Sequence, residues 1–174
     1  MDNHMEGSGS FATVNLPFNF RFYGQNYSQL TICSNGFIMP GSQGSQEWMN
    51  WALPGPMVPR PILAPFWDDL IIYSDSRIAY FHDTENSAFI IEWSALRNRF
   101  SITYQETFQV IIYGTDVLPT PTGDNAFLFQ YKTFNNVDSG NYGVAYVDHG
   151  QFATVGIADH TGMEGLQYTY QNIY

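Results

Sequence analysis

The sequence has few charged residues and very few basic ones. Asp, Glu, Lys and Arg make up 13% of its 174 residues, whereas roughly 25% is usual for soluble domains. Six Lys and Arg face sixteen Asp and Glu, which gives a formal net charge of −10. Binding to nucleic acid or to an anionic membrane surface depends on clusters of basic side chains. We therefore expect neither of these partners.

Cysteine and long apolar runs are also scarce. Cys33 is the only cysteine, so no internal disulfide can form and the redox compartment cannot be read from the sequence. No run of about 18 apolar residues occurs, so we expect no membrane insertion. Residues 1–7 lack the basic and apolar segments of a signal peptide, and we interpret them as an added leader outside the fold. Residues 8–174 are expected to form a single domain.

Aromatic residues are abundant, with 14 Phe and 12 Tyr. From residue 11 onward, short apolar runs alternate with turn clusters, and no stretch keeps the 3.6-residue period of a helix. Phe18, Phe20 and Phe22 alternate with other residues, which places the three rings on one face of a strand. This pattern predicts β-structure throughout the chain.

An Asn-Gly pair marks the clearest turn. Residues 34–36 read Ser-Asn-Gly between two apolar runs, and Asn-Gly favours a tight turn because both residues accept positive φ. We predict a hairpin over 28–39. Further strands are expected at 62–67, 70–73, 78–81, 88–93, 107–113, 126–131, 142–147, 153–158 and 167–170. About ten short strands at this spacing predict an antiparallel β-sandwich.

Residues 40–61 form a long, proline-rich segment without periodicity, which we expect to pack over one edge of the sandwich. A loop of this length inside a domain is usually functional or mobile. Trp48 and Trp51, with Asn50 between them, are the candidate ligand-binding residues, because exposed aromatic planes stack on sugars and anchor protein interfaces. The alternative is that both tryptophans fold inward and cover one open end of the sandwich.

Two adjacent acids are the candidate metal ligands. Asp68 and Asp69 follow one apolar run and precede another. Neighbouring carboxylates repel unless something neutralises them, and Ca²⁺ prefers oxygen ligands. The alternative is that one Asp caps a turn while the other is solvated. We expect no required cofactor, with calcium as the candidate ion.

A catalytic role has weaker support. Glu92 and Glu106 lie in predicted strands, and a carboxylate pair could serve a glycoside hydrolase as acid and nucleophile or base. Alternation instead allows Glu92 to point to solvent or to pair with Arg97 or Arg99. Cys33 lies in an alternating run before a tight turn, where a free thiol usually behaves as a small buried hydrophobe. We expect no catalytic residues.

Asp148-His149 and Asp159-His160 repeat one dipeptide on either side of a predicted strand. At about 3.3 Å per residue the two dipeptides lie too far apart to share one metal ion. We interpret both as turn residues.

Several motifs in order along the chain carry a family resemblance. They are Leu16-Pro17-Phe18, Phe22-Tyr23-Gly24, Cys33-Ser34-Asn35-Gly36-Phe37, residues 62–69, Ile90-Ile91-Glu92-Trp93, residues 106–111, Phe129-Gln130-Tyr131 and residues 153–157. Together they resemble a nidogen-type extracellular domain, of the kind found in large secreted or surface proteins of bacteria that carry C-terminal sorting signals.

The resemblance implies an extracellular antiparallel β module and brings no catalytic residue with it. We therefore expect a non-catalytic accessory or adhesion module of a larger secreted or cell-surface bacterial protein. Its expected partners are a protein or glycan surface ligand and the other domains of a parent polypeptide. The alternatives are a carbohydrate-binding module that uses exposed Trp and Tyr, and a glycoside-acting enzyme that uses the Glu pair.

Overall fold

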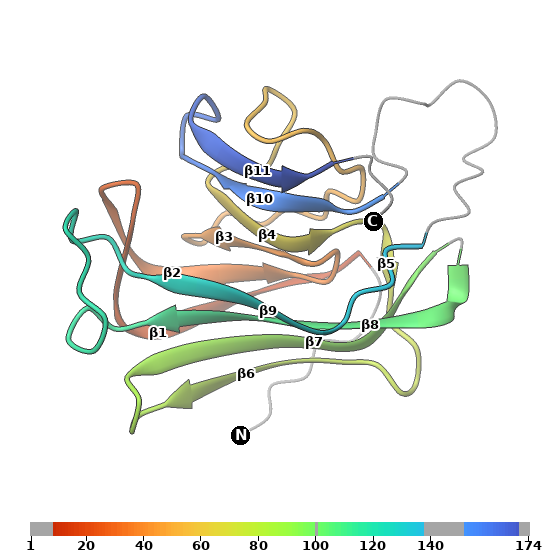
Figure 1. Ribbon diagram of the computed structural model, residues 1–174, viewed down its shortest axis with the longest axis horizontal. Coiled ribbons are helices and arrows are strands. Elements are labelled where there is room, and N and C mark those ends of the chain that lie inside the picture. Colours follow the sequence, from red (N-terminus) through yellow and green to blue (C-terminus); the bar gives the residue numbers. More distant parts are fainter. Residues whose placement is uncertain (1–8, 100, 138–151, 171–174) are drawn as a thin grey trace.

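Two antiparallel sheets make up the computed structural model, which describes residues 9–99, 101–137 and 152–170 (Figure 1). In this described part, sheet A has six strands in the order β1-β2-β3-β4-β10-β11, and sheet B has the order β5-β7-β8-β9 with β6 beside β7. The strands of sheet A are β1 (Phe11–Phe22), β2 (Gln25–Cys33), β3 (Phe37–Pro40), β4 (Ile62–Trp67), β10 (Thr154–Ala158) and β11 (Gly165–Thr169). Those of sheet B are β5 (Leu70–Ile71), β6 (Arg77–Asp83), β7 (Ala88–Asn98), β8 (Ser101–Tyr113) and β9 (Phe127–Thr133). The predicted β-sandwich is confirmed.

Alternation along β1 follows the predicted faces. Phe20 and Phe22 are buried, and the partly buried Phe18 packs against the same core. The strand begins at Phe11, well before the predicted start, because its first half also pairs with β2. The register shifts between Asn15 and Phe20, a stretch that contains a proline unable to donate to the ladder.

Two strands of sheet B are longer than predicted. β7 and β8 pair from Ala88↔Tyr113 as far as Asn98↔Ser101, with register shifts after Trp93. The two strands therefore continue as a ribbon beyond the part of the sheet that is rich in apolar residues. The predicted strand at 142–147 lies outside the described residues.

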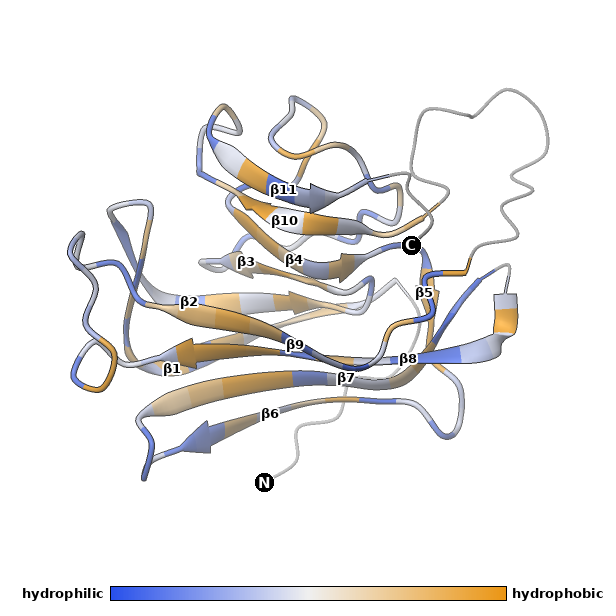
Figure 2. Cartoon of the chain, viewed as in Figure 1, coloured by the Kyte–Doolittle hydropathy of each residue, from blue (hydrophilic) through white to orange (hydrophobic). Residues whose placement is uncertain are grey.

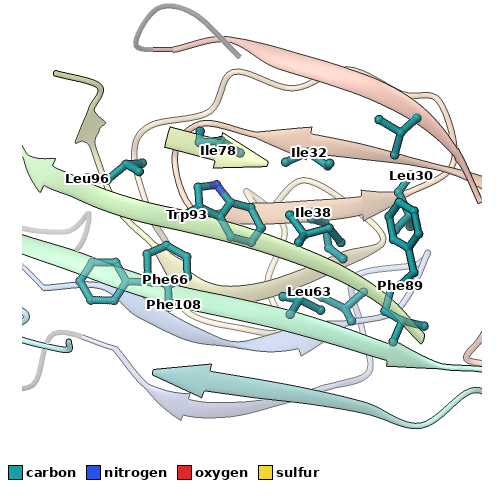
Figure 3. Packing of buried hydrophobic residues seen from close by; sticks show 14 of the residues in the cluster. Leu30, Ile32, Ile38, Leu63, Phe66, Ile78, Phe89, Trp93, Leu96 and Phe108 are labelled. Atoms are coloured by element: carbon teal, nitrogen blue, oxygen red, sulfur yellow. The ribbon is translucent and has the colours of Figure 1, made fainter. Parts of the chain in front are cut away.

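The main core lies between the two sheets (Figure 3). The Phe108 ring stacks on Trp93 at a centroid distance of 5.1 Å and on Phe66 at 5.3 Å. Trp93 also donates its indole N–H to the carbonyl of Cys33, at 2.9 Å. This ring stack joins β7 and β8 of one sheet to β4 of the other, and it satisfies the polar atom of the buried indole.

A second apolar cluster lies on the outer face of sheet A, beneath the 40–61 loop. Leu53 and Val58 of the loop pack there against Phe37, Ile62 and Trp67. The whole of β4 is buried, because one of its faces meets the main core and the other meets this loop. The loop covers a face of sheet A and also reaches its last described strand, β11, where the backbone N–H of Leu53 donates to the Gln167 side chain at 2.8 Å.

The β2–β3 hairpin has a three-residue turn, Ser34 to Gly36, between the paired residues Cys33 and Phe37. Gly36 has φ +77°, and a Cβ built on it would lie 1.8 Å from the backbone oxygen of Phe66. Glycine is therefore required twice, by the backbone conformation and by the close approach of β4.

Gly36→Ala should lower the free energy of unfolding by at least about 3 kcal/mol, because the backbone of β4 has to move as well as the turn. Gly24→Ala is the matched control, since Gly24 has φ +75° but its nearest contact is 3.9 Å away, at the end of a side chain. There we expect only the cost of the backbone conformation, about 1–2 kcal/mol. Denaturant unfolding of both variants checks this, and equal losses would contradict it.

Candidate functional site

The structure separates the three candidate ligand-binding residues of the long loop. Trp48 is 40% exposed, whereas Trp51 packs against the second cluster. Asn50 is buried and donates its side-chain amide to the carbonyl of Phe152 and to the hydroxyl of Thr154. Asn50 therefore ties the loop to the start of β10, and only Trp48 of the three presents a large surface to a ligand.

Asp68 and Asp69 are both buried, and both have protein partners. Asp68 accepts hydrogen bonds from the backbone N–H of Asp69 and from the Asn98 side chain, each at 2.8 Å. Asp69 forms an ion pair with Arg99 at 2.7 Å. The Arg99 guanidinium therefore neutralises part of the negative charge that made calcium a candidate. The Asp69–Arg99 ion pair also joins the start of β5 to the end of β7.

Glu92 and Glu106 do not converge. Along β8 the buried positions alternate with half-exposed ones, and Glu106 shares the buried face with Phe108. Glu92 lies on the other, outer face of the sheet. It pairs there with Gln109 of β8 and accepts a hydrogen bond from the Gln109 side-chain amide at 2.5 Å. The alternative of a catalytic carboxylate pair is therefore overturned, because the two groups point to different faces of one sheet.

Glu106 instead holds a backbone segment. Its two carboxylate oxygens accept the N–H groups of Asn135 and Asn136, at 2.8 and 3.0 Å. The Asn136 side chain in turn accepts the N–H of Ala153, just before β10. Burial raises the pKa of Glu106, and the two backbone donors oppose that rise. The carboxylate is a link between the two sheets.

Cys33 and Asp159 are also residues of the fold, one in the core and one in a turn. Cys33 is fully buried, and this burial raises the pKa of its thiol to about 12, so the thiolate needed for attack is absent at neutral pH. Burial would raise the pKa of Asp159 as well, but hydrogen bonds from Thr161 and from the backbone of the turn lower it to about 2. The predicted turn role of Asp159 is confirmed, and Asp148-His149 lies outside the described residues.

An apolar groove opens where β9 faces the β10–β11 hairpin, and it is the strongest candidate site in the described part. Its volume is about 300 Å³. No charged side chain lines it, and Figure 2 shows apolar residues on all three bordering strands. The lining residues are Phe127, Phe129, Tyr131, Val155, Gly156, Ile157, Leu166 and Tyr168.

Strand alternation builds the groove. Phe127, Phe129 and Tyr131 are the half-buried residues of β9, and the residues between them are exposed on its other face. Tyr131 also donates its hydroxyl to the carbonyl of Pro65 in β4, at 2.7 Å, and burial raises the pKa of this phenol. β9 therefore lies opposite β4 and β10, with its aromatic face directed at sheet A.

Sheet A extends further than sheet B on this side. Leu166 and Tyr168 of β11 line the groove yet are 68% and 76% exposed. Among the described strands β9 ends sheet B, and β11 ends sheet A one strand beyond β10. The apolar side chains of β11 thus lie beyond the cover that β9 provides.

A model of one protein family matches residues 3–173, nearly the whole sequence, and its description is NIDO related. The chain belongs to this NIDO-related family. The resemblance to nidogen-type domains is thereby confirmed, and domains of this type are typically extracellular. No solved structure matches the chain. In the described residues, no helix is long and apolar enough to cross a membrane.

The outer face of sheet B carries a second, polar hollow in this NIDO-related chain. It has a volume of about 340 Å³ and is lined by Glu92, Gln109, Gln130 and Lys132, among others. Beside it lies a row of four exposed or half-exposed apolar residues, one on each of four neighbouring strands and each paired with the next. This outer row consists of Phe81, Ile90, Ile111 and Leu128.

Sequence reasoning missed the groove. Phe129 and Tyr131 appeared only as part of a family motif, and the three strands of the groove are separated by loops in the sequence. The one available signal was the alternation of large apolar residues in β9 and β11, which predicts an apolar face but not what covers it.

Calcium binding at Asp68 and Asp69 would require Arg99 and Asn98 to release the two carboxylates. The described residues hold no group of three or more His, Cys, Asp and Glu placed to bind a metal ion. Since protein donors already serve both carboxylates, we expect the Tm to be the same in chelator and in millimolar Ca²⁺. A native-state site at high occupancy would instead raise it by several degrees, about 2–4 °C per kcal/mol. A rise that Asp69→Asn abolishes would establish the calcium site.

Proposed function

We propose that this chain is a non-catalytic accessory module of a larger secreted or cell-surface bacterial protein, and that it attaches this protein to a partner protein. The apolar groove carries the proposal. A groove lined by aromatic and aliphatic side chains can bury the apolar side chains of a partner. Its lining contains no His, Asp, Glu, Lys, Ser or Cys side chain, the groups that most often serve as general base or nucleophile.

The surroundings of the buried carboxylates support a non-catalytic role. Asp68, Asp69 and Glu106 each bind a donor that holds two parts of the fold together. A catalytic acid or base needs access to a substrate, whereas these groups are enclosed by their partners. Membership in the NIDO-related family is consistent with an extracellular accessory module.

The full 174-residue chain should bind without turnover when it is offered to an array of immobilised extracellular proteins and polysaccharides. We expect retention on protein surfaces and no release of peptide or sugar products, as measured by chromatography of the supernatant. Glu92→Gln and Asp159→Asn distinguish the chain from a contaminating enzyme, because a contaminant's hydrolysis would be the same in both variants. Hydrolysis by the purified chain that either substitution abolishes would overturn the proposal.

Carbohydrate binding is the second candidate, because Trp48 is 40% exposed on a loop that is otherwise fixed to sheet A. An indole that is held in place and half-exposed can stack on a sugar ring. Trp51 and Asn50 would then act indirectly, by holding the loop in position.

Trp48→Ala tests this second candidate. If Trp48 is a sugar platform, retention on polysaccharide columns should fall at least about tenfold, in line with the loss of one aromatic contact, and the Tm should stay unchanged. Phe81→Ala is the control, since Phe81 is 63% exposed on sheet B, far from the loop in the fold. Equal retention by Trp48→Ala and the unmodified chain, or no retention by either, would exclude this site.

A further inference from the structure

We propose that the groove binds an extended, apolar segment of the partner protein, which adds to the edge of β9 that no described strand pairs with, as one more strand of sheet B, and lies over β11. This inference rests on the proposed function and names the class of partner. Three features of the described residues carry it: the lining of the groove, the extra width of sheet A, and the charge at one end.

The lining restricts the chemistry of the occupant. No side chain of the groove is charged, and the Tyr131 hydroxyl in its lining is already bonded to β4. A sugar needs several hydrogen-bond partners and would leave its hydroxyls unpaired here. Aliphatic or aromatic side chains, by contrast, gain about 25 cal/mol for each Å² that they bury.

The geometry of the sheets favours a strand. Neighbouring strands of a sheet lie about 4.8 Å apart, so a strand added to β9 would be displaced from it by the same step that separates β11 from β10. It would therefore lie opposite β11 and cover Leu166, which is now 68% exposed. The side chains of Phe127 to Tyr131 span about 13 Å along β9, at roughly 3.3 Å per residue. About five extended residues fill that length.

β9 has few of the features that protect an edge strand. Its sequence, Phe127 to Thr133, contains no proline or glycine, and Lys132 is its only charged residue. In the described part of the chain, β9 pairs only with β8. Edge strands of this kind present a row of backbone N–H and C=O groups to an incoming chain.

Charge sets the polarity of the occupant. Asp159 follows β10 and Glu164 precedes β11, so both lie at the Ile157–Leu166 end of the groove. Asp159 stays ionised at any neutral pH, because its hydrogen bonds hold its pKa at about 2. Arg60 binds the Thr161 carbonyl at the same turn, so Asp159, Glu164 and Arg60 together leave a formal charge of −1 there. Because the whole chain also carries −10, a segment with Lys or Arg at this end is favoured, and a second copy of the same acidic chain is disfavoured.

The test begins with a phage-displayed library of random octapeptides, selected on the full chain. We expect enriched peptides to alternate large apolar residues and to carry Lys or Arg near one end. One enriched peptide is then synthesised with a fluorophore, and its Kd is measured by fluorescence anisotropy. Two versions are N-methylated at alternate residues, one at the odd and one at the even positions. The version that loses the N–H groups directed at β9 should bind at least about tenfold more weakly.

Two protein variants locate the site. Leu166→Glu places a charge in the groove and should weaken the peptide at least about tenfold. Leu128→Glu is the matched control, because Leu128 is 46% exposed on the same strand as the groove aromatics but points to the other face of sheet B. There we expect a change within about threefold. Glu164→Lys should weaken the binding of peptides that carry Lys or Arg near one end.

Several outcomes would overturn the inference. Equal effects of Leu166→Glu and Leu128→Glu, or unchanged binding of both N-methylated peptides, would show that binding is not strand addition in the groove. A concentration-dependent dimer that Leu166→Glu abolishes would assign the groove to a second copy. No enrichment on a monomeric chain would overturn the inference. If the chain nevertheless binds the protein array without turnover, the proposed function stands and only this inference fails.

Discussion

The close approach of the Asn35–Gly36 turn to β4 is the contact on which the rest of the sandwich depends. Gly36 lets the backbone of Phe66 come within a distance that no side chain would allow, and its carbonyl accepts the N–H of Phe66 at 3.2 Å. The buried Asn35 side chain accepts the N–H of Leu70 and donates to the carbonyls of Gln46 and Glu47. One turn therefore joins the β2–β3 hairpin, the start of the long loop and the crossing from sheet A to sheet B. Each of these buried polar groups would otherwise need another partner.

This junction explains why the two outer faces of the sandwich differ. Because the loop is fixed at Glu47, where its carbonyl also accepts the Trp67 indole N–H at 3.1 Å, its apolar residues cover the outer face of sheet A. β4 then becomes a strand that is buried on both sides, and its uninterrupted apolar sequence is the expected result. Sheet B has no such cover in the described residues. Among the described residues, its outer row and the overhang of β11 are two of the apolar surfaces that stay exposed.

Local chemistry in the sequence predicted the parts of the fold that depend on neighbouring residues. The phenylalanine alternation of β1 and the Asn-Gly turn both follow from local pattern. The pairing of β1 before residue 18 could not be read, because it depends on the partner strand. The faces of Glu92 and Glu106 follow from their register across β7 and β8, which no period within one strand contains. The groove is still harder to predict from the sequence, because it depends on sheet A extending one strand further than sheet B at this side.

The buried carboxylates show how an acidic chain of this kind uses its charges. A carboxylate in the core costs several kcal/mol unless donors surround it, and Glu106 meets that cost with two backbone N–H groups of the segment that leaves β9. Through Asn136 the same link reaches Ala153, where the chain enters β10. The carboxylate therefore positions the two strands that form opposite walls of the groove. An ionisable residue of this kind serves binding by fixing the shape of a site that it does not touch, and its raised pKa is a consequence of that position.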